Sequence, residues 1–282
     1  MDLCVISAAL SGVAADKRHC PAIPYTPEEY ADEAQRAFDA GASVVHLHAR
    51  YPDGRPSYRV EEYRAITEAI RTRVPEIIIN YSTGAIGVAR EDRVAHVSEL
   101  RPDFAALNMG SMNYAKYSRE RKEFVFDFCF ENTYDTIGFF LQAMNQAGVR
   151  PECECFDSGH LAGAQPLIDM GLLRLPASFS LVVGVLGGSP ATPEALRYLS
   201  TLVPDGSPWQ VVGISRRQWE MVETAAALGG HVRVGLEDNF YLPDGSMARS
   251  NGELVACAAQ QIAQTGRKIA SPSEARSILG IA

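Results

Sequence analysis

The stretch V-V-H-L-H-A-R, residues 44–50, predicts a short buried strand that ends in polar side chains. Its two β-branched valines favour a strand. Because side chains alternate along a strand, His46 and His48 point to one face and Leu47 points to the other. Two imidazoles at a strand end form half of a divalent metal site, and imidazole suits zinc. One buried and one exposed histidine is the alternative interpretation of the motif.

Helix-start signals flank this strand on both sides. Thr26-Pro27-Glu28-Glu29 combines an N-cap threonine, a proline at the first helical position and two acids, and a second start lies near Ser57. Further starts are predicted at residues 191–194 and at Ser215, a helix at 251–264, and a short terminal helix capped by residues 271–274. The predicted strands are Leu3–Ala8, Ser43–His48, Glu76–Ser82, Phe104–Asn108, Pro151–Phe156, Ser180–Val185, Trp209–Gly213 and His231–Leu236.

This alternation of eight strands with helices predicts a (β/α)8 TIM barrel with extra C-terminal helices, formed by residues 1–282 as a single domain. A doubly wound open sheet is the competing fold. That fold prefers fewer strands and a glycine-rich first turn, whereas the loop after the first strand reads S-G-V-A-A-D-K-R, without G-x-G-x-x-G. In a barrel, the active site lies at the C-terminal ends of the strands.

The composition narrows the classes of partner. The chain has 282 residues, 46% of them hydrophobic, and a formal net charge of −8, which argues against a nucleic-acid partner. We expect no membrane partner, because no apolar run approaches the roughly 18 residues of a membrane span. The N-terminus lacks the basic region of a secretory signal. Six scattered cysteines without a structural zinc spacing favour free thiols and a cytoplasmic location.

Polar side chains follow several predicted strands, and each has a functional and a structural interpretation. Ser82 and Thr83 precede a glycine turn, and Asn108 ends the fourth strand. We treat these three as candidate substrate-binding residues, although the serine and threonine also suit a simple turn. Glu152 and Glu154 share one face of an apolar strand. Carboxylates inside a barrel must be paired, protonated or bound to metal, since an isolated buried charge is costly.

The eighth strand ends in H-V-R-V-G-L-E-D-N, which places Arg233, Glu237 and Asp238 close together in sequence. Two histidines and one carboxylate leave coordination positions open, as catalytic zinc sites require, and Glu237 is our candidate for the third ligand. Arg233 can hold either a substrate carboxylate or Asp238. A metal beside such a pair can polarise a carbonyl while a base removes the adjacent C–H proton. A simple surface turn is the alternative interpretation.

Longer motifs resemble one family, the β-keto acid cleavage enzymes, over nearly the whole chain. The resemblance rests on A-A-L-S-G, P-A-I-P-Y-T-P-E-E, G-A-S-V-V-H-L-H-A-R, D-G-R-P-S, I-I-N-Y-S-T-G, R-P-D-F-A-A-L-N-M-G-S-M-N, P-E-C-E-C-F-D-S-G, G-V-L-G-G-S-P and G-G-H-V-R-V-G-L-E-D-N. It implies a TIM barrel with one divalent ion per chain, usually zinc, on His46, His48 and Glu237. It further implies acetyl-CoA as co-substrate, a β-keto acid as substrate and a homotetramer. The family reaction condenses the two substrates and cleaves the product by retro-Claisen chemistry to acetoacetate and a new acyl-CoA.

The resemblance also implies individual roles. Asp238, paired with Arg233, looks like the base that removes the α-proton of the substrate. Ser82 matches a serine that contacts the substrate's carboxylate end, and Glu154 looks like a catalytic glutamate near the metal. The glycines of G-V-L-G-G-S-P, residues 184–190, would let a backbone approach the thioester closely, although a plain loop accounts for them equally well.

Two departures from the family pattern bear on specificity. Ala14 stands where members acting on an amino-bearing keto acid have an acidic residue, so 3-keto-5-aminohexanoate is not the expected substrate. Ala106 stands where members often have a hydroxyl. Both changes make the substrate-binding pocket less polar. Lys17 and Arg18 could meet an anionic substrate tail, or could be solvated loop charges.

Two other functions remain open at this stage. A zinc hydrolase or lyase on a TIM barrel is the first, because amidohydrolases also carry H-x-H on a strand. They carry it on the first strand, however, with further histidines later, whereas His231 is the only later strand histidine here and begins its strand. A non-catalytic barrel that senses a metal or a ligand is the second.

Overall fold

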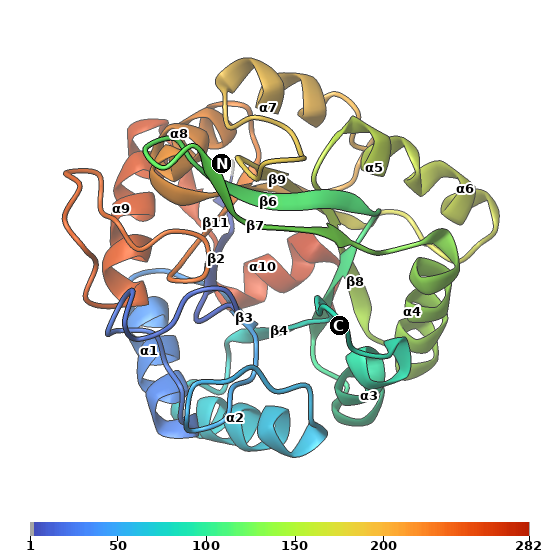
Figure 1. The fold of residues 1–282 in the computed structure, drawn as a ribbon, viewed down its shortest axis with the longest axis horizontal. Coiled ribbons are helices and arrows are strands. Elements are labelled where there is room, and N and C mark those ends of the chain that lie inside the picture. Colours follow the sequence, from blue (N-terminus) through green and yellow to red (C-terminus); the bar gives the residue numbers. More distant parts are fainter. Residues whose placement is uncertain (1–2, 282) are drawn as a thin grey trace.

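The computed structural model describes residues 3–281, and its centre is a closed barrel of eight parallel strands (Figure 1). Neighbouring strands pair around the barrel in the order β10-β11-β2-β3-β4-β5-β8-β9. The barrel strands are β2 (Ile6–Ala9), β3 (Val44–Leu47), β4 (Ile78–Ser82), β5 (Phe104–Asn108), β8 (Arg150–Cys155), β9 (Ser178–Val183), β10 (Trp209–Gly213) and β11 (His231–Val234).

Helices surround the barrel, as the alternating pattern predicts. They are α1 (Pro27–Asp39), α2 (Val60–Arg73), α3 (Arg90–Leu100), α4 (Tyr134–Ala147), α5 (Ser158–Ala162), α6 (Ala164–Asp169), α7 (Pro193–Ser200), α8 (Gln218–Ala227), α9 (Asn251–Gln264) and α10 (Pro272–Leu279). Helices α1 and α10 both begin with a capping box, in which Thr26 and Ser271 accept from the third helical residue. The prediction of a (β/α)8 barrel is confirmed.

Most predicted strand bounds differ from the observed ones by at most two residues, and two local predictions were wrong. The first predicted strand is two strands, because β1 (Leu3–Cys4) leaves the barrel and pairs with β12 (Lys268–Ile269). Helix α2 begins at Val60 rather than near Ser57, whose hydroxyl accepts from a backbone N–H in a turn. The helical segment predicted to start at Ser215 does start there, as a 3-10 turn (Ser215–Arg217) that leads directly into α8.

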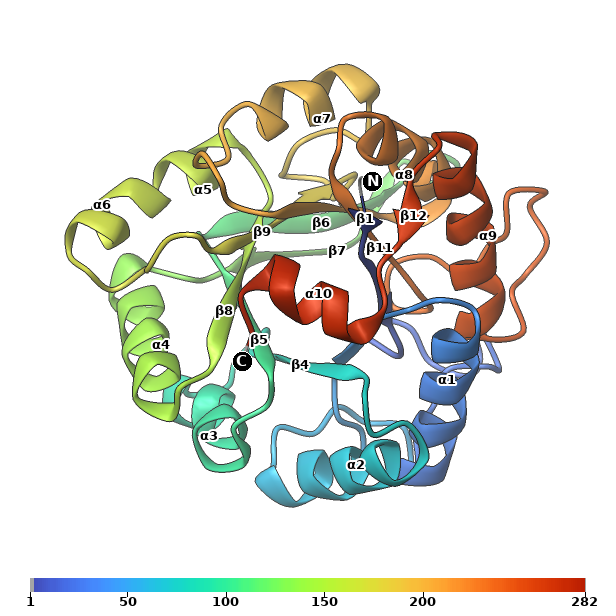
Figure 2. The ribbon, with the colours of Figure 1, turned by 180° about the vertical axis from the view of Figure 1, so that it is seen from behind.

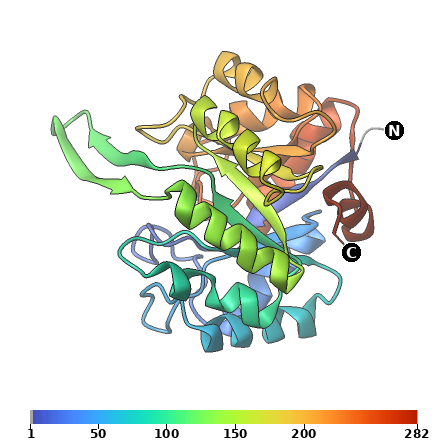
Figure 3. The same ribbon diagram turned by 90° about the vertical axis from the view of Figure 1, so that its right-hand side faces the viewer.

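A β-hairpin after the fourth barrel strand was missed. Strands β6 (Met112–Ser118) and β7 (Glu123–Phe130) pair with each other outside the barrel. Figure 3 shows this hairpin as a long ribbon that projects away from the body of the protein. The run E-F-V-F-D-F-C-F, residues 123–130, alternates large aromatic residues with others, and this was the available sequence signal for β7.

The interior of the barrel is layered. At the N-terminal end, Val5, Val44, Ile78 and Phe104 form an apolar layer that α10 covers with its buried side chains (Figure 2). Above it lies a polar layer around Glu152, which is fully buried. The charged residues predicted for the active site lie at the opposite, C-terminal end. Within the described part of the chain, no helix is long and apolar enough to span a membrane.

Candidate metal centre and active site

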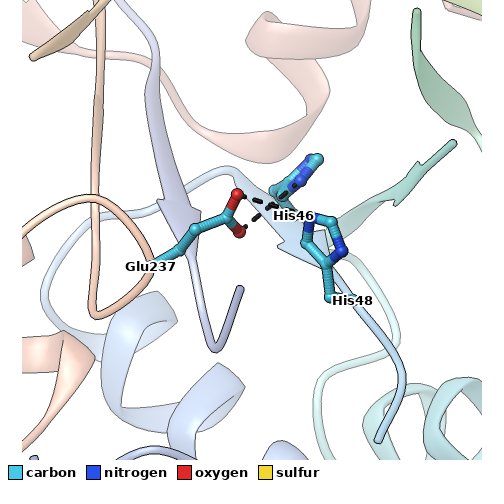
Figure 4. A group of neighbouring side chains, drawn as sticks. All are labelled: His46, His48 and Glu237. Carbon is cyan, nitrogen blue, oxygen red and sulfur yellow. Dashed lines mark ion pairs between the residues drawn. The ribbon is translucent and has the colours of Figure 1, made fainter. Parts of the chain in front are cut away.

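The two histidines of β3 and its exit meet Glu237 at the C-terminal end of the barrel (Figure 4). Barrel strands β11 and β3 both pair with β2, so residues that follow them lie on either side of one strand. Glu237 lies in the turn after β11, and its backbone N–H donates to Ala9 of β2 at 3.2 Å. The predicted motifs are therefore brought together by the topology of the barrel.

The distances suit a metal ion. His46 Nε2 lies 3.6 Å from Glu237 Oε2, and His48 Nε2 lies 3.3 Å from Glu237 Oε1. Ligands about 2.0–2.1 Å from a tetrahedral zinc ion are roughly 3.3 Å apart. Among the residues described, His46 Nε2 and Glu237 Oε2 are buried and have no hydrogen-bond partner. A cation bound between these atoms would satisfy both.

The charge around these ligands points the same way. The buried guanidinium of Arg233 donates to Glu154 at 2.9 Å, to Glu237 at 2.8 Å and to both oxygens of Asp238 at 2.9 and 3.0 Å. With all three carboxylates ionised, the cluster around this guanidinium has a formal charge of −2. Because uncompensated charge is costly in a buried site, a divalent cation bound there would balance the charge of the cluster.

The pKa directions reflect this crowding. Burial raises the pKa of both Glu154 and Asp238, while Arg233 acts in the opposite direction. Burial by itself would raise the pKa of Glu237 as well, but Arg233 and the two histidines hold the pKa of that carboxyl well below its usual value. For His46, burial and then Arg233 keep the pKa well below its usual value, so the ring is neutral and able to bind metal.

Comparison with known proteins identifies the family. The family model for the beta-keto acid cleavage enzyme matches residues 4–281. The chain belongs to the β-keto acid cleavage enzyme family. This is a family of enzymes, so a purely sensing role and an amidohydrolase-type reaction are set aside.

Two curated relatives and one solved structure extend this result. The chain is 41% identical over 282 residues to the 3-keto-5-aminohexanoate cleavage enzyme of Fusobacterium nucleatum, covering 100% of this chain and 99% of the relative. It is 34% identical to the 3-oxoadipate:acetyl-CoA acetyltransferase of Cupriavidus necator, covering 99% and 95%. The apo structure of ObcA superposes with a TM-score of 0.77 at 23% identity. That match covers 93% of this chain but 66% of the ObcA chain, and it supports the barrel fold.

The predicted substrate-binding residues of this β-keto acid cleavage enzyme divide into two groups. Ser82 and Asn108 are buried at the ends of adjacent strands, and both flank Gly84, each about 3.4 Å from where a Cβ would lie. Ala106 is the register partner of Ser82. The hydroxyl of Thr83, by contrast, donates to the Ala106 carbonyl at 2.7 Å, which favours a role in the turn.

The loop between β2 and α1 carries Ala14, which is exposed. Two residues earlier, Gly12 has a φ of 60°, and a Cβ there would lie 2.6 Å from Glu237 Cγ. Buried Arg50 donates to the carbonyls of Gly12 and Ala15, at 2.8 and 2.5 Å. The loop is thus held beside the proposed metal ligand, which puts Ala14 near the mouth of the site.

The two basic residues of this loop have other partners. Lys17 forms an ion pair with Glu29 and lies 4.6 Å from the centroid of the Tyr25 ring. Arg18 is highly exposed and pairs with Asp16 at 2.5 Å. These contacts favour the interpretation of both as loop charges.

The glycine-rich loop at residues 184–190 is packed against protein backbone. A Cβ at Gly187 would lie 1.8 Å from the Asn113 carbonyl oxygen, and one at Gly188 would lie 2.8 Å from that of Phe156. The loop also contacts the hairpin, because Ala115 donates to Leu186 at 3.3 Å. These glycines are explained by the close approach of β6 and of the Phe156 backbone.

Sequence analysis missed Tyr114 of β6. Burial raises the pKa of this tyrosine to about 12, and Asp238, Glu237 and Glu154 add to the effect. The hairpin thereby places an aromatic side chain within electrostatic reach of the carboxylate cluster. The ring of Phe128 on β7 stacks against the Tyr114 ring, with 5.3 Å between the two ring centroids.

Proposed function

We propose that this enzyme converts a β-keto acid and acetyl-CoA into acetoacetate and a new acyl-CoA, with one zinc ion per chain on His46, His48 and Glu237. The observation that carries the proposal is the cluster in which these three ligands adjoin Asp238 across the single guanidinium of Arg233. Family membership and the acetyl-CoA-dependent relative from Cupriavidus necator support the reaction class. When bound, the metal supplies a Lewis acid for the keto oxygen.

The side chains divide the remaining work. Asp238 removes the proton between the keto and carboxylate groups, and Arg233 holds its carboxylate by two parallel hydrogen bonds. The carbanion attacks the acetyl carbonyl, a C–C bond forms, and the CoA thiolate leaves. The thiolate then attacks the original keto carbon and breaks its bond to the α-carbon. The released acetoacetate carbanion takes its proton back from Asp238, so the base is regenerated.

The remaining candidate residues take different roles in this scheme. Ser82 and Asn108 are buried at the ends of neighbouring strands. We assign them, with Thr83 as part of their turn, to the carboxylate end of the keto acid. Glu154 neither donates nor accepts a proton in this scheme. It is the third carboxylate that pairs with Arg233, and its Oε1 lies 2.9 Å from the guanidinium. We assign Lys17 no direct contact with substrate, because it pairs with Glu29.

A substrate panel tests the proposal. Purified protein is incubated with acetyl-CoA and β-keto acids of apolar, amino-bearing and acidic tails, and acetoacetate is followed by NMR. We expect formation to require acetyl-CoA, to cease after chelation and to return with zinc. Cleavage that proceeds without acetyl-CoA would indicate a hydrolase instead, and no turnover of any keto acid in the panel would remove the proposed reaction.

Ala14 yields a specificity prediction. We expect Ala14→Glu to raise kcat/KM for 3-keto-5-aminohexanoate roughly tenfold, since a hydrogen bond to a charged group contributes about 1.5–3 kcal/mol. Steady-state kinetics with an uncharged-tail keto acid provide the reference, and Ala14→Gln is the isosteric variant without charge. An unchanged ratio between the two substrates in Ala14→Glu would place residue 14 away from the substrate tail.

We further propose a homotetramer in which the β6–β7 hairpin supplies part of the contact between copies of the chain. The hairpin is a two-stranded sheet outside the barrel, and such sheets are marginally stable alone. The hairpin exposes three aromatic side chains, those of Tyr117 (45%), Phe124 (57%) and Phe126 (38%). With aromatic side chains of about 150–250 Å² each, this leaves roughly 300 Å² of apolar surface, a substantial part of the ~800 Å² that each partner buries in a stable interface.

The oligomer proposal predicts that Phe124→Asp combined with Phe126→Asp lowers the molar mass in solution below that of the wild type. Light scattering after size-exclusion chromatography measures this, and circular dichroism confirms folding. Tyr198→Asp, an equally exposed aromatic position on α7, is the control and should leave the mass unchanged. A wild-type mass in the double variant would exclude the exposed aromatic residues of the hairpin from the contact between copies. We also propose a cytoplasmic location, which the free thiols of Cys20, Cys129, Cys153, Cys155 and Cys257 support.

A further inference from the structure

The polar layer below the proposed metal centre contains a buried carboxylate with three neutral donors. Glu152 is fully buried and accepts hydrogen bonds from Asn80, Ser180 and Gln210, the last at 2.5 Å. These three residues come from β4, β9 and β10. The layer lies inside the barrel, below the groups assigned above to the chemistry.

Glu152 determines which way the amide of Asn80 faces. A carboxylate only accepts hydrogen bonds, so Asn80 must present its NH2 group to Glu152. A reversed amide would place its oxygen against the carboxylate, which is repulsive. The oxygen Oδ1 of Asn80 is therefore turned away from Glu152. In the part of the chain described, this oxygen is buried and has no hydrogen-bond partner.

The neighbour across the sheet is His46. Asn80 and His46 are register partners on β4 and β3, and both are nearly fully buried. The ring nitrogen Nε2 of His46 faces Glu237, so Nδ1 is at the opposite edge of the ring. Nδ1 is also buried without a partner among the described residues. One strand pair thus contains an unpartnered acceptor and an unpartnered ring nitrogen.

The tautomer of His46 decides whether it can bind a metal. A neutral imidazole carries one proton, and Nε2 offers a lone pair to an ion only when the proton is on Nδ1. In metalloproteins the second ring nitrogen almost always donates to an oxygen acceptor, which sets the tautomer and the ring orientation. Asn80 Oδ1 is such an acceptor.

We propose that Glu152 and Asn80 are positioning residues that act through His46: Glu152 orients the Asn80 amide, and Asn80 Oδ1 accepts the Nδ1–H proton of His46. This rests on the proposed function in that His46 is taken as a metal ligand. The chain Glu152–Asn80–His46 connects the polar layer to the metal centre. This gives the buried carboxylate of Glu152 a role in orienting a metal ligand.

Glu152→Gln is the decisive variant. Its amide can donate to Asn80 and so allows Asn80 to reverse and present NH2 to His46, which favours the tautomer protonated at Nε2. We expect zinc affinity, measured by competition with a chromophoric chelator, to fall roughly 10- to 100-fold, the usual cost of losing such an outer partner. Ser180→Ala is the matched control, because it removes another donor to Glu152 without touching Asn80, and should change the affinity less than twofold.

A second readout does not need the metal. Nitrogen-15 NMR of histidine-labelled, metal-free protein reports the tautomer of His46, assigned by its loss in His46→Ala. We expect the Nδ1–H form in the wild type and its loss in Glu152→Gln; Asn80→Ala serves if that variant does not fold. Wild-type tautomer and affinity in Glu152→Gln, or an equal loss in Ser180→Ala, would overturn the inference. A wild-type protein that shows the Nδ1–H tautomer but binds no zinc would contradict the metal site, while the proposed chain Glu152–Asn80–His46 would still stand.

Discussion

His46→Ala is expected to abolish both metal binding and turnover. The variant removes one of three protein ligands, whose facing atoms lie within 4.8 Å of one another. Loss of a Lewis acid that stabilises developing charge costs several kcal/mol, so we expect kcat/KM to fall at least roughly 10³-fold. Metal content, measured by plasma mass spectrometry, should drop from about one zinc per chain to a small residual fraction.

The fold should survive this substitution. Apart from the Nδ1–H bond to Asn80 proposed above, His46→Ala breaks no hydrogen bond, because the two ring nitrogens have no other hydrogen-bond partner in the described chain. It also removes a neutral group that burial and Arg233 prevent from protonating, as the lowered pKa of His46 shows. Thermal unfolding in the presence of chelator should therefore be similar in wild type and variant, whereas added zinc should stabilise the wild type alone.

His19→Ala is the control for a histidine outside the cluster, because His19 lies in an exposed loop and pairs with Asp16. It should retain both zinc and activity. If His46→Ala kept a full complement of zinc, the ligand assignment would be wrong. If it lost zinc but kept turnover, the metal would be structural and the proposed chemistry would have to run without it.

The barrel could be predicted because its strands are short apolar runs between clear breakers. Residues 104–108 and 209–213 were predicted with the observed bounds for this reason. The division of the first predicted strand into β1 and β2 could not be predicted, since β1 pairs with Lys268 and Ile269, more than 260 residues away. Pairing over such a distance depends on where the C-terminal segment packs, which local periodicity does not record.

The metal cluster was predictable for a topological reason. In a closed barrel the first strand separates the second from the eighth, so a histidine pair and an acidic turn on those strands meet. Roles that depend on side-chain rotamers were not predictable in this way. Thr83 and Lys17 were candidate substrate-binding residues like Ser82, yet the Thr83 hydroxyl donates to the Ala106 carbonyl and the Lys17 ammonium pairs with Glu29.

The polar layer illustrates a signal that was present and not used. Asn80 interrupts the apolar run I-I-I-N-Y-S of β4, and a polar residue in a buried strand must find a partner. The partner, Glu152, lies 72 positions later on β8. The hairpin was missed for the opposite reason: β7 has a clear alternation, but its partner β6 has a weak one, and the barrel pattern led us to expect a helix after every strand.

Asp238→Asn is expected to keep the metal and lose proton abstraction. Asparagine has nearly the same shape as aspartate but cannot accept the α-proton, and general-base catalysis contributes roughly 10²- to 10⁴-fold. The most direct measurement omits acetyl-CoA and follows exchange of the substrate α-protons with deuterium by NMR. This isolates the first step from condensation and cleavage. Exchange should fall by that factor while zinc content stays near one per chain.

Glu154→Gln separates the two carboxylates that share Arg233. Glu154 and Asp238 both have a pKa raised by burial, and both accept from the same guanidinium, so each could serve as the base on electrostatic grounds. Geometry distinguishes them, because Asp238 is held by two parallel hydrogen bonds and adjoins the proposed ligand Glu237 in sequence. We therefore expect Glu154→Gln to retain most α-proton exchange. The reverse pattern, in which exchange persists in Asp238→Asn and is lost in Glu154→Gln, would transfer the role of base to Glu154.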